Sequence, residues 1–453
     1  MTAPPETPLL HRELPARRVE PHQADDVATG AVLLRQVELA NGFTDLIVPR
    51  SPAGGTYGAV QVLVRLHRRP LGLAIVPLDG RRVVDASLLA EVVVEELHDE
   101  INAHLAADGL PPVDRLPDPR IVPTLEAPCR HERTLARHAD VPVSVVVTTC
   151  NRPSFVRRCV QSILRSSYPR LEVVVVENRP EGSTVAAAVA DAFPGDERLR
   201  YVEEPRRGLS RARNRGIDHA RGEITVFTDD DVLVDRHWLA HIVEAFTTSA
   251  AACVTGLILP VELETPAQHW LEEFGGFAKG FAGRTYDAAS GRSDPLYPYA
   301  AGRFGSGANT ALLTSVARDL HGFDTNLSAG TLAAGGEDLD LYIRLLRGGR
   351  RLTYQPSAIV WHRHHRELST LTRQLFHYGT GLSAALTKQL LAVPGRGDLV
   401  RRVPRGVSYL LHSESSKNHR KSSGYPRVLT YAELFGFAFG PAAYLWTAAS
   451  HRG

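Results

Sequence analysis

The chain has 453 residues, of which 43% are hydrophobic, and this is enough for two or three domains with cores of their own. Its formal net charge is only +2, which excludes bulk attraction to nucleic acid and requires any charge-driven function to be local. The four cysteines have no spacing typical of a disulfide framework or a zinc site, so a reducing cytoplasm is the expected compartment.

The N-terminal third predicts three segments. Residues 1–29 are rich in proline and charge, lack the apolar core of a secretory signal, and predict a flexible tail. Residues 30–110 predict a small α/β domain, with two strands around the turn at 67–70 and an amphipathic helix that ends at Gly109. The proline-dense residues 111–140 predict a linker, because proline disfavours regular structure.

Residues 141–370 predict the main domain, in which apolar strands alternate with helices. The expected strands are 141–149, 171–178, 199–204 and 223–228, with helices at 152–167, 183–193 and 209–220 between them. This alternation is typical of βαβ units with a mostly parallel sheet. Ligands of such sheets bind beyond the carboxyl ends of the strands, so the residues that follow each strand are the first candidates for a site.

Three consecutive carboxylates, Asp229, Asp230 and Asp231, follow the fourth of these strands. Clustered carboxylates repel one another unless they are solvated or neutralised, and hard divalent cations such as Mg²⁺ or Mn²⁺ prefer oxygen ligands. A solvated acidic turn is the alternative. The position at the end of a buried strand favours a cation.

Five ordered motifs give the chain a family resemblance. They lie at 143–164, 208–232, 305–313, 321–346 and 358–364, and include "TDDDV", "GSGANTALL", "GGEDLDLYIRLL" and "AIVWHRH". With them the chain resembles the inverting glycosyltransferases of family 2, which have the GT-A nucleotide-sugar-binding fold. The resemblance implies an α/β fold class, with a mostly parallel sheet flanked by helices, a small N-terminal α/β segment and a helical C-terminal region at 371–453.

The resemblance implies a divalent metal, Mn²⁺ or Mg²⁺, on the diphosphate of a sugar nucleotide. Asp229, Asp231 and His362 are the implied metal ligands. The resemblance also implies contacts with a UDP- or dTDP-linked donor, and Glu177 stands where the base-binding residue is more commonly Asp. The expected donor-binding residues are Thr148, Arg152, Glu177, Arg213, Asn214, Asp229, Asp230 and Asn309.

The segment "GGEDLDLYIRLL" supplies the candidate catalytic residues. An inverting transferase needs a general base that takes the proton of the acceptor hydroxyl. The family pattern favours Asp338 as this base, with Glu337 holding acceptor or sugar hydroxyls. Ordinary carboxylates at a helix N-terminus are the alternative, since the helix dipole favours them.

The expected function is metal-dependent, inverting hexosyl or deoxyhexosyl transfer in glycan biosynthesis. A nucleotidyltransferase that makes sugar nucleotides is a second hypothesis, although residues 148–155 lack the Gly-rich basic loop that it would need. A non-catalytic nucleotide-sugar-binding module is a third. The acceptor stays open between a glycan, a lipid-linked glycan and a small molecule.

The C-terminal region raises the question of a membrane. Residues 431–449 are apolar but contain Glu433 and Pro441, and they follow the basic segment 417–427. A packed helix pair is the first expectation. Peripheral contact with the inner face of the plasma membrane is the alternative, because a basic and apolar segment can lie in a membrane interface.

Overall fold

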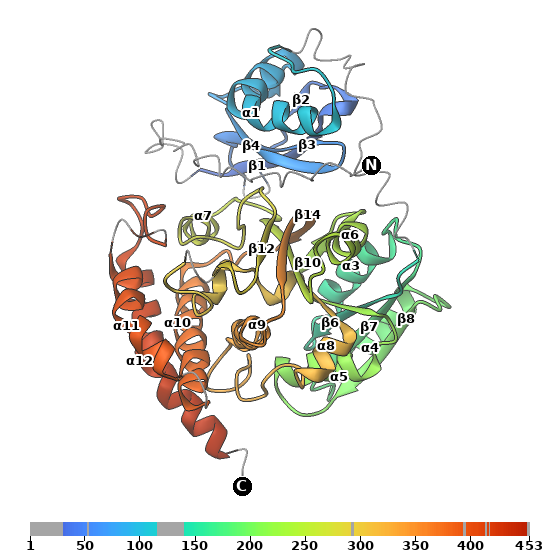
Figure 1. Ribbon diagram of the computed structural model, residues 1–453. Helices are drawn as coiled ribbons and strands as arrows, with labels where there is room; N and C mark the ends of the chain where they lie inside the picture. Colours follow the sequence, from blue (N-terminus) through green and yellow to red (C-terminus); the bar gives the residue numbers. More distant parts are fainter. Residues whose placement is uncertain are drawn as a thin grey trace, which may run out of the picture.

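The computed structural model describes residues 30–51, 54–115, 140–290, 294–392, 396–412, 415 and 417–450. The predicted tail at 1–29 and most of the predicted linker at 111–140 therefore lie outside the described residues. The described part forms a small N-terminal unit above a larger α/β body, with a group of helices at one side (Figure 1).

The N-terminal unit is a sheet covered by one long helix. Strand β1 pairs in parallel with β3, and β3 pairs antiparallel with β4. The predicted turn is the β3–β4 hairpin, and the predicted helix is α1; strand β1 was not predicted. The bounds are β1 (Val32–Glu38), η1 (Leu39–Asn41), β2 (Leu46–Ile47), β3 (Ala59–Leu66), β4 (Arg69–Pro77), β5 (Val83–Val84) and α1 (Ala86–Asp108).

Ion pairs and apolar contacts join this unit to the larger body. Arg65 on β3 contacts Asp235 at 2.8 Å, and Arg69 on β4 pairs with Glu244. Leu63 packs in one buried cluster with residues of the main sheet, among them Leu257. The two units are therefore held by buried contacts as well as by the chain between them.

The body is built on a nine-stranded sheet with the order β10-β14-β11-β13-β9-β6-β7-β8, and β12 pairs with β14. Strands β9, β6, β7 and β8 are mutually parallel, as predicted, whereas β13 runs antiparallel to both of its neighbours. The bounds are β6 (Val143–Thr149), β7 (Leu171–Asn178), β8 (Leu199–Glu204), β9 (Ile224–Asp229), β10 (Val232–Val234), β11 (Cys253–Pro260), β12 (Arg284–Tyr286), β13 (Thr310–Leu313) and β14 (Leu352–His362).

Helices cover both faces of this sheet because its strands are apolar on both sides. In β6, Val145 and Val147 join the buried cluster that includes α3 and α6, whereas Val146 joins the cluster that includes α5 and α9. The mostly parallel α/β fold class is confirmed. The helix bounds are α3 (Pro153–Leu164), α4 (Val185–Ala192), α5 (Leu209–His219), α6 (Trp238–Ser249), α7 (Pro266–Glu273), η4 (Ala301–Arg303), η5 (Gly307–Asn309), α8 (Thr314–Asp319) and α9 (Glu337–Arg347).

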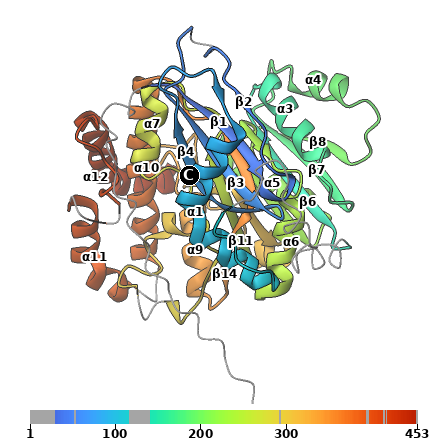
Figure 2. The ribbon, with the colours of Figure 1, turned by 90° about the horizontal axis from the view of Figure 1, so that it is seen from above.

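Three further helices form the C-terminal region, namely α10 (Leu368–Leu391), α11 (Arg396–Leu411) and α12 (Arg427–Ser450). Seen from above, they lie on the side of the molecule opposite the β6–β8 edge of the sheet (Figure 2). Helix α12 packs along α10, and a third of its most apolar window is buried. Among the described residues, α12 alone has the length and composition of a membrane-crossing helix.

Candidate active site

The acidic triplet lies in the short turn between β9 and β10, and its three carboxylates have different surroundings. The side chains of Asp229 and Asp231 are 29% and 17% exposed, whereas that of Asp230 is 4% exposed. Asp230 accepts hydrogen bonds from Oγ1 of Thr149 (2.7 Å) and from Arg152 (2.5 Å). Burial raises the pKa of Asp230 to about 7, against the opposing charge of Arg152. Asp230 therefore anchors the turn, and its contact with a donor stays a prediction.

Asp229 and Asp231 meet His362, the last residue of β14. One ligand atom from each of the three side chains lies within 4.8 Å of the others, and Nε2 of His362 is 3.4 Å from Oδ1 of Asp231. Within the described part of the chain, Oδ1 of Asp231 and Nδ1 of His362 are buried without a hydrogen-bond partner. Burial lowers the pKa of His362, which favours the neutral imidazole that ligates metals. This oxygen and nitrogen donor set fits a divalent cation.

Arg152 lies beside this cluster, at the start of α3. Its guanidinium contacts Asp230 and is 3.1 Å from Asp231, and it stacks 4.2 Å from the ring of Phe155. Its side chain is 40% exposed. Arg152 is therefore placed where it can contact an anionic group of a ligand that binds beside Asp230 and Asp231.

Glu177 and Thr148 lie at the carboxyl ends of β7 and β6. Glu177 is fully buried, accepts a hydrogen bond of 2.6 Å from the hydroxyl of Tyr201, and accepts a longer one of 3.3 Å from the backbone N–H of Asn151. Thr148 pairs with Asp229 in the sheet register. No sequence pattern had indicated Tyr201.

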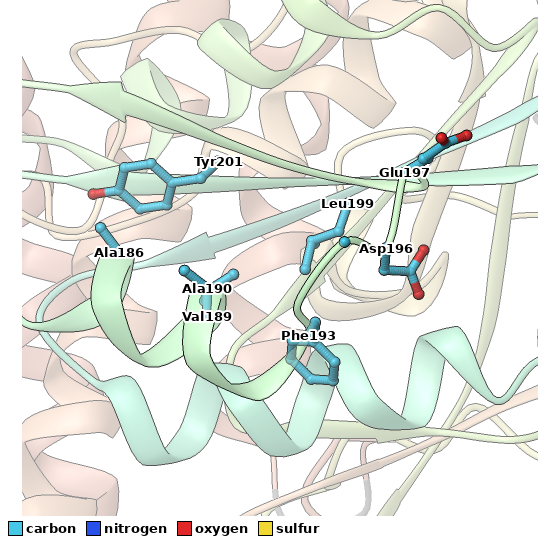
Figure 3. Close-up of a pocket in the computed structure, with 9 residues that line it drawn as sticks. Ala186, Val189, Ala190, Phe193, Asp196, Glu197, Leu199 and Tyr201 are labelled. Carbon is cyan, nitrogen blue, oxygen red and sulfur yellow. The ribbon is translucent and has the colours of Figure 1, made fainter.

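Tyr201 also lines a recess of about 370 Å³ between α4 and β8 (Figure 3). The opposite wall is formed by small or apolar side chains of α4, among them Ala186 and Val189. The charged side chains at its rim, Asp196 and Glu197, are both acidic. This recess therefore lacks the cations that a diphosphate requires.

Arg213, on α5, links the acidic triplet to the second acidic motif. Its side chain is 2% exposed and contacts Glu337 at 2.7 Å and Asp229 at 3.1 Å. The ring of Phe323 lies 5.3 Å from the guanidinium carbon. Arg213 is deeply buried and joins the two acidic motifs, and its direct contact with a donor stays a prediction.

Glu337 and Asp338 form the first turn of α9. Oδ2 of Asp338 accepts a 2.8 Å hydrogen bond from the backbone N–H of Gly307, which fixes the carboxylate while leaving it half-buried. Glu337 is buried, and this burial raises its pKa to about 7 against the charge of Arg213. Of the two carboxylates, Asp338 is the more accessible.

Two further residues predicted to bind the donor make hydrogen bonds within the fold. The side-chain amide of Asn309 is buried, donates to the carbonyls of Leu257 and Ala358, and accepts from the indole N–H of Trp238. The amide of Asn214 bonds to both the N–H and the carbonyl of Phe323. Their contacts with a donor stay predictions.

A wall of aromatic and basic groups beside the cluster was not predicted. The ring of Phe277 lies 4.9 Å from that of His362 and 6.4 Å from that of Tyr378 on α10. Burial lowers the pKa of Lys279 to about 8, and Glu272 and Asp338 oppose this shift. These side chains come from the segment after α7 and from α10, whose sequences carry no motif.

Comparison with known proteins finds similarity to glycosyltransferases. Residues 144–316 match the family model "Glycosyl transferase family 2". The pre-mycofactocin glycosyltransferase of Mycobacterium tuberculosis is 28% identical over 64% of this chain and 54% of its own length. The succinoglycan biosynthesis protein ExoM of Rhizobium meliloti is 29% identical over 48% of this chain and 65% of its own length. The chain thus spans about half to two thirds of these relatives.

Solved structures of other proteins also align with part of this chain. A mannosyltransferase from Pyrobaculum calidifontis, in complex with GDP-Man and Mn²⁺, aligns with a TM-score of 0.43 and 21% identity over 71% of this chain and 86% of its own. TarS residues 1–349 from S. aureus align with a TM-score of 0.40 and 14% identity over 69% of this chain and 91% of that one.

Proposed function

We propose that this chain, whose residues 144–316 match the glycosyl transferase family 2 model, transfers a sugar from a nucleoside-diphosphate sugar to an acceptor hydroxyl with inversion. The observation that carries the proposal is the convergence of Asp229, Asp231 and His362 at the carboxyl edge of the sheet. Arg213 connects this cluster to the Glu337–Asp338 pair. The proposed cation site and the proposed carboxylate base then belong to the same active site.

In this proposal Asp229, Asp231 and His362 hold a divalent metal, Mn²⁺ or Mg²⁺. A bound metal at this position neutralises the charge that develops on the departing diphosphate. Arg152 adds a cation at the same edge, since its half-exposed guanidinium can contact a phosphate oxygen. Thr148 and Asp229 are neighbours in the sheet register and line the donor side.

Asp338 is the proposed general base. The acceptor oxygen attacks the anomeric carbon, its proton passes to the Asp338 carboxylate, and the bond from the anomeric carbon to the diphosphate oxygen breaks. The hydrogen bond from Gly307 holds the carboxylate in place for this transfer. Glu337 is held by Arg213 and supports the position of the first turn of α9.

Glu177 and Tyr201 support a nucleobase site beside the cluster, and we assign a UDP- or dTDP-linked donor to it. The buried Glu177 carboxylate can accept hydrogen bonds from the N–H edge of a pyrimidine base, with Tyr201 fixing its orientation. The names of the two relatives refer to pre-mycofactocin and to succinoglycan biosynthesis, and they do not agree on one acceptor. We leave the acceptor as a hydroxyl of a glycan, a lipid-linked glycan or a small molecule.

We place the protein in the cytoplasm, with peripheral contact at the inner face of the plasma membrane. The support is an exposed apolar face on the C-terminal helices, including Phe435 and Trp446 on α12 and Val403 on α11. Arg401 and Arg405 are exposed on the same helix α11. Apolar and basic side chains together suit an anionic lipid surface.

The test is donor binding by titration calorimetry. UDP-, dTDP- and GDP-linked sugars are titrated with Mn²⁺, with Mg²⁺ and with EDTA, into the wild type and Asp231→Asn. We expect one uridine or thymidine donor to bind only with metal, and the affinity to fall at least about tenfold in Asp231→Asn, since each lost metal ligand weakens the site. Asp218→Asn, an exposed carboxylate on α5, is the control. Absence of metal-dependent binding for every donor rejects the proposal.

A further inference from the structure

A second cluster of metal-ligating side chains lies in the N-terminal unit, far from the acidic triplet in the chain. His67 belongs to the turn between β3 and β4, and His104 and Asp108 belong to the last turns of α1. Nδ1 of His67 lies 3.0 Å from Nε2 of His104 and 3.0 Å from Oδ2 of Asp108, and the latter two atoms are 3.2 Å apart. Three ligand atoms thus form one small triangle.

When Asp108 is ionised, protons on the two imidazoles cannot satisfy all three sides of this triangle. If both imidazole nitrogens donate to Asp108, then two donors face each other across 3.0 Å. If His67 donates to His104 instead, then the lone pair of His104 faces the carboxylate oxygen. A single cation between the three atoms satisfies every contact, because Zn²⁺ bonds of about 2.0–2.2 Å separate tetrahedral ligands by roughly 3.3 Å.

The surroundings also favour a cation. The side chains of His67 and Asp108 are each 4% exposed, and burial makes an ionised carboxylate costly unless it is paired or coordinates a metal. Asp108 is the last residue of α1, where the negative end of the helix dipole disfavours an anion and favours a cation. A bound metal would relieve both effects.

The turn that presents His67 is strained. His67 and Arg68 have φ values of 51° and 68°, a left-handed conformation that Asn and Gly adopt more readily. Glu38 holds the turn by accepting 2.8 Å hydrogen bonds from both backbone N–H groups. Strain of this kind is found where a side chain must be held in a fixed position.

We propose that His67, His104 and Asp108 bind a divalent transition metal, Zn²⁺ by preference, which ties the C-terminal end of α1 to the β3–β4 turn. Two imidazoles and one carboxylate suit zinc better than magnesium. The neighbouring Arg65 and Arg69 carry the ion pairs to the main body, so the metal stabilises the part of the N-terminal unit that contacts it. This proposal is independent of the proposed transferase function.

The test measures Zn²⁺ binding by a protein in which the cluster of Asp229, Asp231 and His362 has been disabled. Untagged full chain carrying Asp231→Asn and His362→Ala is stripped with EDTA, and Zn²⁺ is titrated against a chromophoric chelator. We expect one Zn²⁺ to bind per chain. Adding His104→Ala or Asp108→Asn should lower the Zn²⁺ affinity at least about 100-fold, because loss of an outer-shell partner alone costs up to that much. His98→Ala, an exposed histidine on the same helix, is the matched control.

A second readout keeps the test independent of folding. Co²⁺ replaces Zn²⁺, and its visible d–d bands are recorded in the same variants, with circular dichroism in EDTA as the check that each variant is folded. We expect Asp108→Asn to alter the Co²⁺ spectrum and His98→Ala to leave it unchanged. The proposal is overturned if the parent protein binds no Zn²⁺, or if folded His104→Ala and Asp108→Asn variants bind it as tightly as the parent or no more weakly than His98→Ala.

Discussion

Arg213 is the residue on which both acidic motifs depend. It is 2% exposed and contacts Asp229 and Glu337, so its removal leaves two carboxylates without their cation. We expect Arg213→Met to lower the free energy of unfolding by about 3–5 kcal/mol, the usual cost of breaking a buried ion pair from one side. Chemical denaturation checks this. Arg215→Met, an exposed position on the same helix, should change stability little, and equal losses in the two variants would contradict the assignment.

Asp230 should make stability depend on pH. Burial raises its pKa from 3.8 to about 7, so the folded state holds this proton more tightly than the unfolded chain. The resulting stabilisation is complete below the unfolded pKa and is lost as the pH rises through about 7. Asp230→Asn cannot titrate at this position. The wild type should therefore lose about 2–3 kcal/mol relative to Asp230→Asn between pH 5 and pH 8, at roughly 1.4 kcal/mol per pH unit.

This difference is measured by denaturant unfolding in EDTA, so that metal binding does not contribute. Asp319→Asn, whose carboxylate is 62% exposed, is the control and should show no such trend. A difference between wild type and Asp230→Asn that stays constant with pH would show that Asp230 is ionised in the folded protein throughout this range.

At the scale of elements, glycines set the contact between α10 and α12. A Cβ on Gly436 would lie 2.0 Å from the carbonyl oxygen of Phe376, and one on Gly379 would lie 2.0 Å from that of Glu433. We expect Gly436→Ala to lower the melting temperature, because the two helix backbones must separate and overpacking typically costs about 1–3 kcal/mol. Gly406 on α11 has open space around its Cβ position. Gly406→Ala should be neutral or stabilising, and the same loss in both would contradict this packing.

The sequence predicts elements well where the pattern is local. The bounds 171–178 and 199–204 coincide with β7 and β8, and in β7 the apolar run 173–176 lies between polar residues. The antiparallel insertion of β13 between β9 and β11 was not predicted, since strand direction depends on partners that are distant in sequence. The strand ends indicated a cation beside the acidic triplet, whereas His362 was added through the family resemblance. The structure brings Asp229, Asp231 and His362 together.

Other parts of the site depended on long-range contacts. Arg213 meets Glu337 across 124 positions, and Asn309 meets Trp238 across 71. A motif shows that such residues belong together, but it does not show which atoms they contact. The structure shows the contacts that Arg213 and Asn309 make within the fold, and no pattern had indicated Tyr201 or Phe277.

At the scale of the molecule, the C-terminal helices give a prediction about lipid. Phe435 and Trp446 are 70% and 69% exposed. We expect the protein to sediment with vesicles of phosphatidylcholine and phosphatidylglycerol, and the doubly substituted Phe435→Ser, Trp446→Ser variant to bind at least about tenfold more weakly, since each large apolar side chain contributes roughly 1.5–3 kcal/mol. Ile47→Ser, at an exposed apolar position in the N-terminal unit, is the control. Vesicle binding that is absent, or equally weakened by Ile47→Ser, would contradict a specific membrane face.

The most direct measurement follows release of nucleoside diphosphate from the selected donor, with Mn²⁺ or Mg²⁺ and with EDTA, in the wild type and Asp338→Asn. If sugar transfer takes place at this site, then release of nucleoside diphosphate by the wild type must depend on metal. Transfer also requires Asp338→Asn to lower kcat by about 10²–10⁴-fold, the usual contribution of a general base, with the donor Kd nearly unchanged. Release that persists in EDTA, or that Asp338→Asn leaves intact, would contradict metal-assisted transfer with Asp338 as the base.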